Sequence, residues 1–308
     1  MTTTVSGWPS LRRELELSER LFGSSGPARL GAWLAGEAAK VGDAAFARLF
    51  SDHIDLPGIA PGDYAHRHLR SRRGALLGGI RFYGRDIARP FVEIVAHSFG
   101  ETGTLAAVAA AEWRAFAPRA MRLRLLPGDA MPGRSRIDTS IHAARYDALR
   151  PPPPGLRLLP FSDPCAALAL VAGRFAHMAA ADPALRRNVS PLDPRELIEL
   201  WEAGQVHGIS PDGSRAAGLI AVAPGSIGWI EGDEIMEEVV AVPASGRGLA
   251  AAAQGALAAR DGADPGRLLI GTIDGLNTAS RRSAERAGRP RVLDHVFVAL
   301  PGPGQARP

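Results

Sequence analysis

Residues 234–250, EIMEEVVAVPASGRGLA, begin the most informative stretch of this chain of 308 residues. An acidic extended stretch is followed by a glycine-containing turn at 245–248 and by an alanine-rich helix predicted over 249–260. Glycines at such a turn let the backbone approach a ligand, and the next helix presents unpaired N–H groups and the positive end of its dipole. The pattern therefore predicts a cradle for a phosphate or a pyrophosphate.

One interpretation of this turn is a dinucleotide site, because Gly246, Gly248 and Ala251 have the spacing G-x-G-x-x-G/A. Asp274 ends the next predicted strand, but it lies 28 residues after Gly246 (274 − 246 = 28), where about 20 are expected. The strand before the turn also carries several acids, whereas a central parallel strand is nearly all apolar. The sequence does not favour a dinucleotide site.

The turn and the residues after it resemble the GNAT superfamily of acyl-CoA-dependent N-acyltransferases. The resemblance is carried by Ser245-x-x-Gly248-x-Ala250, the apolar strand 268–274, Asn277-x-x-Ser280 and Ala287-Gly288-Arg289. The predicted elements over 156–300 also follow the order of that fold: strand, two helices, two hairpin strands, long strand, helix, strand, helix, strand. The resemblance covers about half of the chain.

The resemblance implies that acetyl-CoA, or another acyl-CoA, is the co-substrate and that no metal is needed. The backbone at the end of the long strand would hold the acyl and pantetheine part, and the turn amides would take the pyrophosphate, with Arg247 assisting by charge. Asn277 would bond the pantetheine arm or its neighbouring backbone, and Ser280 would lie near the thiol or the phosphates. The binding residues so implied are Val240, Ala241, Val242, Ser245, Gly246, Arg247, Gly248, Leu249, Ala250, Asn277 and Ser280.

Attack of a neutral amine on a thioester needs a base for the ammonium and an acid for the departing thiolate. The period of two in a strand predicts that Glu234 and Glu238 share one face, while Glu237 lies on the other. The family often places its base on this strand, eleven residues before the turn, which points to Glu234. The alternative is that these acids form an exposed strand edge that discourages aggregation.

The acid is less well defined. The family's usual tyrosine, seven residues after the asparagine, is replaced by Ala284, and the three tyrosines of the chain all precede residue 151. The proton would then come from Ser283, His295, water or a residue of the other domain. Otherwise the protein would bind acyl-CoA without turnover, as a sensor.

Residues 151–155, PPPPG, predict a semi-rigid linker between a domain over 1–150 and a domain over 156–308. Predicted strand 91–96, helix 105–116 and strand 121–126 repeat the order of 235–242, 249–260 and 268–273. The resemblance then implies an α/β fold of the α+β type with two GNAT-like domains, each a mixed, mostly antiparallel, twisted sheet flanked by helices. The first copy is degenerate, because its turn at 98–103 lacks G-x-G and contains Glu101.

The composition excludes several other classes of protein. The single cysteine, Cys165, cannot form an intramolecular disulfide, and no secretory signal or apolar run of about 18 residues is evident, so we expect a cytoplasmic protein without a membrane partner. The net charge of +4 is mild, and the basic stretch 66–73 is a poor nucleic-acid footprint. The expected function is transfer of an acetyl or acyl group to a primary amine of a small molecule.

Overall fold

The computed structural model describes residues 4–301, which form two compact units. The first unit contains residues 4–138 and 293–301, and the second contains residues 139–292. The proline-rich segment 151–155 therefore lies inside the second unit and does not separate the two units. The reason is that residues 139–150 supply a strand and the buried core residue Tyr146 to that unit.

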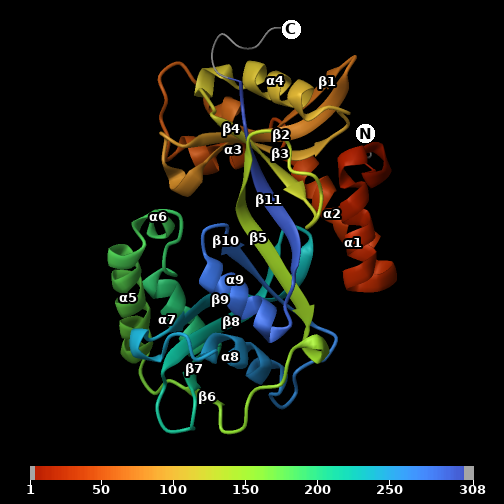
Figure 1. Ribbon diagram of the computed structural model, residues 1–308. Coiled ribbons are helices and arrows are strands. Elements are labelled where there is room, and N and C mark those ends of the chain that lie inside the picture. Colours follow the sequence, from red (N-terminus) through yellow and green to blue (C-terminus); the bar gives the residue numbers. More distant parts are fainter. Residues whose placement is uncertain (1–3, 302–308) are drawn as a thin grey trace. The chain divides into compact units, whose positions relative to one another are not determined.

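The first unit has a sheet in the order β1-β2-β3-β4-β11, in which only β3 and β4 run parallel. Residues 26–51 form two helices rather than one. The chain turns at Gly42, which has a φ of +66°, and the Asp43 carboxylate then caps the second helix at Ala45 N and Phe46 N. The elements are α1 (Arg12–Phe22), α2 (Gly26–Ala39), α3 (Ala44–Ser51), β1 (Arg67–Ser71), β2 (Gly74–Phe82), β3 (Pro90–His97), α4 (Thr102–Glu112), β4 (Ala120–Leu125) and β11 (Arg291–Ala299) (Figure 1).

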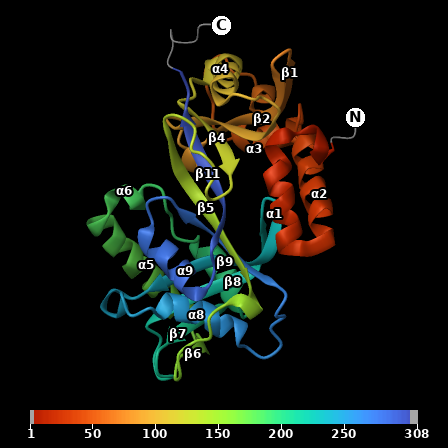
Figure 2. The same cartoon turned by 45° about the vertical axis from the view of Figure 1, so that its right-hand side comes forward.

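The second unit has a sheet in the order β5-β10-β9-β8-β7-β6, in which only β9 and β10 run parallel. Helices cover both of its faces (Figures 1 and 2): Ile220 packs with α8, whereas its neighbours Leu219 and Ala221 pack with α5 and α7. The elements are β5 (Ser135–Arg145), β6 (Arg157–Pro160), α5 (Pro164–Ala181), α6 (Pro183–Arg186), α7 (Pro194–Glu202), β7 (Val206–Ser210), β8 (Gly218–Ile227), β9 (Ile230–Val240), α8 (Leu249–Ala258), β10 (Leu268–Asp274) and α9 (Thr278–Ala287).

Each unit completes its sheet with a strand from the other half of the sequence. β11, the last strand of the chain, pairs antiparallel with β4 in the first unit, from Asp294 opposite Leu125 to Ala299 opposite Ala120. β5 precedes the proline-rich segment, yet it pairs antiparallel with β10 in the second unit. This exchange means that neither half of the sequence contains a whole sheet.

The internal repeat predicted from the sequence is present in both units. β3, α4 and β4 form a strand, helix and parallel strand, and so do β9, α8 and β10. The parallel pairing ends at Glu93 opposite Arg122 in the first unit and at Glu234 opposite Ile270 in the second. The mixed, mostly antiparallel fold of the α+β type and its tandem arrangement are therefore confirmed.

We expected no apolar run of about 18 residues, but one helix has that length and a high mean hydropathy. α5 has 18 residues with a mean hydropathy of 1.3, so it is long and apolar enough to cross a membrane by length and composition alone. Its residues Ala167, Val171 and Phe175 are buried against the sheet of the second unit, where a core helix of a globular fold also packs. Such a helix is weak evidence for a membrane span.

Candidate functional site

The central feature of the second unit is the point at which β9 and β10 part. The two strands pair at Asp233 opposite Leu269 and at Glu234 opposite Ile270. Beyond that point β9 continues to Val240 and β10 to Asp274 without pairing to each other. Backbone N–H and C=O groups that have lost their partner strand can pair with an extended polar ligand.

The glycine turn follows β9 directly. After a short 3₁₀ turn over Val242–Ala244, Gly246 and Gly248 adopt φ values of +79° and +76°. Only glycine takes this left-handed conformation without strain, so the sequence pattern and the geometry agree. The first helical hydrogen bond of α8 runs from Ala252 N to Gly248 O (3.0 Å), which leaves the earlier N–H groups of the helix to a ligand or to water.

The predicted arrangement of the acids on β9 is wrong. Glu238 lies opposite Ile220 and Glu237 opposite Ala221, but Ile235 lies opposite Val222, so Met236 is an extra residue in a β-bulge. A bulge shifts the alternation of side chains by one residue. Glu234, opposite Ala223, consequently shares the α5 and α7 face with Glu237, while Glu238 lies on the α8 face.

Glu234 occupies the point where the strands part. Its side chain is half-buried, and it lies across Gly225, where a β-carbon would come within 2.7 Å of its Oε2. Burial raises the pKa of its carboxyl above the usual value. Among residues 4–301 the carboxylate has no hydrogen bond or ion pair. Glu234 is thus a carboxylate with increased proton affinity that remains free to contact a ligand.

Glu238 is instead part of a buried network between the sheet and α8. Gln254 Nε2 donates to both of its oxygens (3.1 Å each), and Arg289 Nε donates to Gln254 Oε1 (3.1 Å). Burial raises the pKa of Glu238 to about 7, although Arg289 opposes this, and burial lowers the pKa of Arg289 to about 10. His142 Nδ1 donates to Arg289 O (3.1 Å). These hydrogen bonds hold α8 against the sheet, so the role of Glu238 is structural.

Sequence reasoning missed this network and the task of Glu237. Glu237 Oε2 accepts a hydrogen bond from Leu192 N (3.0 Å) and so holds the segment that precedes α7. The available signal was Arg289, a charged residue directly after the glycine that ends α9, where an apolar residue packs more easily.

Several of the implied binding residues already have partners. Asn277 caps α9, because its Oδ1 accepts from Ser280 N (3.1 Å). Ala241 N donates to Ala217 O (2.9 Å), so it is not available to a ligand, and Val242 is exposed at the start of the 3₁₀ turn. Ser245 Oγ donates weakly to Ala241 O (3.4 Å). The backbone groups that remain available to a ligand are therefore those at the end of β9 and in residues 246–251.

The expected source of the acid also changes. His295 lies on β11 in the first unit, opposite Arg124, because that strand is exchanged. Burial and the charges of Arg122 and Arg124 lower its pKa well below the usual value, which disfavours the imidazolium form that a general acid needs. The second unit does contain a tyrosine: Tyr146, whose hydroxyl donates to Asp233 Oδ2 (2.8 Å). Burial and Asp233 raise its pKa.

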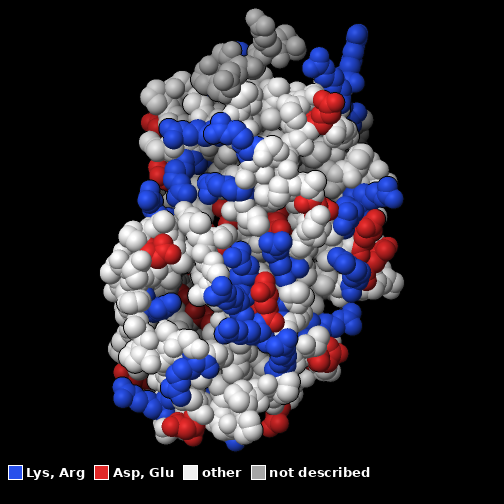
Figure 3. Space-filling model, in the orientation of Figure 1, with Lys and Arg blue, Asp and Glu red and all other residues white. Residues whose placement is uncertain are grey.

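Basic side chains gather over α9 in the second unit (Figure 3). That helix contributes Arg281, Arg282 and Arg286, with Glu285 between them, and Arg247 is exposed in the glycine turn. An excess of positive charge beside a helix N-terminus favours an anionic ligand. Within residues 4–301, no group of three or more His, Cys, Asp or Glu side chains is placed to hold a metal ion.

No protein-family model and no curated protein matches this chain. Among solved structures it is similar to a GNAT-family acetyltransferase from Colwellia psychrerythraea (12% identity, 82% of this chain and 94% of that chain, TM-score 0.44). It is also similar to a GCN5-related N-acetyltransferase from Sphaerobacter thermophilus (16%, 88% and 96%, 0.42). A tandem GNAT protein from the clavulanic acid biosynthesis pathway overlaps it at 14% identity (91% and 96%, 0.41).

The sequence identities and TM-scores are low, so the fold is described by the order and pairing of the chain's own helices and strands. The second unit has the order strand, helices, hairpin strands, long strand, helix, parallel strand, helix. Its long strand parts from its parallel neighbour and ends in a glycine turn. This order of elements, with a strand, helix and parallel strand repeated in both units, is the order that the resemblance to the GNAT superfamily predicts.

Proposed function

We propose that this protein transfers an acetyl or acyl group from CoA to a primary amine of a small molecule. The observation that supports this best is the position of Glu234, a half-buried carboxylate without a partner, at the point where β9 and β10 part. The glycine turn at the start of α8 lies at the end of the same strand. β9 therefore carries the proposed base, Glu234, and leads into the glycine turn that would bind the pyrophosphate.

In this proposal the turn amides bind the pyrophosphate of acetyl-CoA, and the pantetheine lies between the parted strands. Glu234 takes a proton from the ammonium of the acceptor, directly or through one water. The neutral amine attacks the thioester carbonyl and the C–S bond breaks. The nitrogen loses one proton as the amide forms, and the thiolate takes up one proton, through water, to leave as free CoA. A raised pKa makes Glu234 a stronger base at neutral pH than an ordinary glutamate.

A second candidate function is binding of acyl-CoA without turnover, as in a sensor. The observation that favours it is Ala284, which is fully buried in α9 where the family has its tyrosine. Tyr146 does not fill that place directly, because its hydroxyl is held by Asp233.

The two functions are separated by incubating the protein with acetyl-CoA and a panel of primary amines while free thiol is measured. Amine-dependent thiol release that is lost in Glu234→Gln, with acetyl-CoA binding retained, supports the transferase. Binding of acetyl-CoA without thiol release for every amine supports the sensor.

A further inference from the structure

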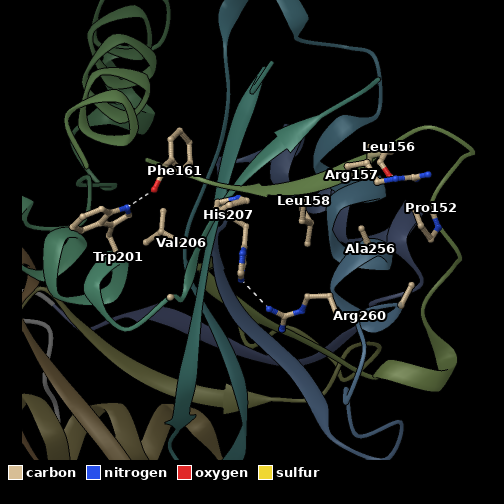
Figure 4. A pocket seen from close by; sticks show the side chains of 13 residues that line it. Pro152, Leu156, Arg157, Leu158, Phe161, Trp201, Val206, His207, Ala256 and Arg260 are labelled. Atoms are coloured by element: carbon tan, nitrogen blue, oxygen red, sulfur yellow. Dashed lines mark hydrogen bonds between the residues drawn. The ribbon is translucent and has the colours of Figure 1, made fainter. Parts of the chain in front are cut away.

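A cavity in the second unit lies at the end of α8 opposite the glycine turn. It has a volume of about 600 Å³, and its lining comes from β6, β7, α7 and the last residues of α8 (Figure 4). Ala256 and Arg260 line it, whereas the turn ends at Gly248. At 1.5 Å per helical residue, twelve residues separate Arg260 from Gly248 by roughly 18 Å. The cavity is therefore separate from the glycine turn, although Arg260 also contacts Tyr146, whose hydroxyl donates to Asp233 of β9.

Every charged side chain that lines this cavity is basic. Arg157 and Arg260 line it, and it has no acidic lining residue. Neither guanidinium forms an ion pair with a carboxylate among residues 4–301. Two cations that share a cavity without a counter-charge favour an anionic occupant.

A hydrogen bond to His207 orients the guanidinium of Arg260. Arg260 Nη1 donates to His207 Nε2 (2.8 Å), and Figure 4 shows the two side chains pointing toward each other. Burial and the charge of Arg260 lower the pKa of His207 to about 4, so the ring is neutral and accepts that hydrogen bond. Its Nδ1 then carries the proton and can donate to an occupant of the cavity.

Most of the other lining residues are apolar. Leu158 and Val206 line the cavity together with Phe161, Trp201 and Pro152. Trp201 is held in place because its Nε1 donates to Phe161 O (2.8 Å). Apolar and aromatic side chains of this kind favour the apolar ring of a ligand. A volume of about 600 Å³ lies within the usual range for sites that bind small organic molecules.

We propose that this cavity binds an aromatic carboxylate, with the carboxylate on Arg260 and His207 and the ring against the apolar walls. An amine, the acceptor class proposed above, would be repelled by the same two arginines. This site is consequently additional to the acyl-transfer site and does not depend on it.

The test is calorimetric titration of the full-length chain with three ligands that share one ring system: 2-naphthoate, neutral 2-naphthamide and cationic 2-naphthylmethylamine. We expect 2-naphthoate to bind with a Kd below about 1 mM and the amine not to bind. Arg260→Gln should weaken 2-naphthoate about tenfold, because a charge-assisted hydrogen bond is lost. Arg195→Gln, which removes an exposed arginine outside the lining, is the matched control and should leave the affinity unchanged.

A second variant, Ala256→Met, keeps helix propensity and narrows the cavity from α8, so it should also weaken 2-naphthoate. Both variants should bind acetyl-CoA as the wild type does. The proposal is overturned if 2-naphthoate does not bind, if the cationic amine binds equally well, or if Arg260→Gln and Arg195→Gln behave alike. Displacement of 2-naphthoate by acetyl-CoA would also overturn it, because the cavity would then belong to the acyl-CoA site.

Discussion

The two units contain the same pair of parting parallel strands, but their acids have different surroundings. In the first unit the last paired acid is Glu93, and Arg122 Nε lies 2.6 Å from its Oε2. Arg122 also contacts Asp138 (3.0 Å). In the second unit the equivalent acid, Glu234, lies opposite Ile270, which offers no charge. The ion pair neutralises Glu93, whereas Glu234 has no ion pair among the residues that the structure describes.

The space between the parting strands also differs. In the first unit Arg124 Nη2 donates to Val95 O (2.8 Å), and Glu14 of α1 forms an ion pair with Arg124 (2.9 Å). His97 N donates to Ser10 Oγ (2.8 Å). Val95 O and His97 N are therefore already bonded, the first by Arg124 of β4 and the second by Ser10 of the N-terminal segment, and the cavity beside them is only about 130 Å³.

The turns after the two strands complete the contrast. Four residues, 98–101, connect β3 to α4, whereas eight residues, 241–248, connect β9 to α8. Gly246 and Gly248 have positive φ, and Gly100 does not. Glu101 stands at the N-cap of α4, where an anion would lie. One fold thus gives a filled site and an open site through a few side chains and one turn.

The sharpest way to test this contrast is to replace the two equivalent acids separately. Glu234→Gln should lower kcat about 10²–10⁴-fold, because the base is lost, while the Kd for acetyl-CoA stays the same. Glu93→Gln should leave kcat unchanged and lower only the stability. Equal turnover in Glu234→Gln and wild type, measured by thiol release, would remove Glu234 from the mechanism.

The N-terminal segment in the first unit can be tested by stability. The side chains of Glu14 and Arg124 are 3% and 9% exposed, so Glu14→Ala leaves a buried guanidinium without its partner. We expect a loss of about 3–5 kcal/mol in the free energy of unfolding. The control is Glu16→Ala on the same helix, whose side chain is 55% exposed and should contribute less than about 1 kcal/mol. Similar losses in chemical denaturation would mean that the ion pair does not hold α1 in place.

The glycine turn of the second unit can be tested with a matched pair. Gly248→Glu places a side chain and a negative charge in the cradle, and we expect acetyl-CoA binding about 100-fold weaker. Gly262, just after α8, has nearly the same φ (+77°), so Gly262→Glu reproduces the backbone strain and the charge away from the turn. If calorimetry shows the same loss in both variants, backbone strain rather than a pyrophosphate contact explains the effect.

The smallest expected effect concerns Glu238. Its pKa in the folded protein, about 7, lies above the usual 4.5, so the protonated carboxyl stabilises the fold below about pH 4.5 and that stability is lost as the pH rises through about 7. Between about pH 5 and pH 8 the wild type should lose roughly 2 kcal/mol of stability. Glu238→Gln should remove this slope, and Glu285→Gln, an exposed acid on α9, should retain it. An unchanged slope in Glu238→Gln would assign the titration to another group.

The sequence predicted the local parts of this molecule and missed the non-local ones. The turn at 245–248, the parallel pair around α8 and its fainter copy in the first half follow from patterns within about 40 residues. The pairing of β5 with β10 and of β11 with β4 could not be predicted, because partners distant in the sequence leave no periodic signal. Because of this exchange, Tyr146 belongs to the second unit and His295 to the first, the reverse of the domains predicted from the sequence.

The candidate site shows the same limit. Glu234 was predicted as the base from its spacing to the turn, and that role stays a prediction. The predicted face of Glu234 relative to Glu238 was wrong, because a bulge at Met236 leaves no signature in the alternation of side chains. The N-terminal segment that fills the first site was also missed, because the ion pair of Glu14 joins residues 110 positions apart.

The number of acetyl-CoA molecules bound per chain tests the central claim most directly. Calorimetric titration of the full-length protein should give a stoichiometry of one, because only the second unit has an open strand pair and a glycine turn in the part of the chain that the structure describes. A stoichiometry of two would show that the first unit also binds acetyl-CoA and would contradict the account. Absence of binding would contradict it as well.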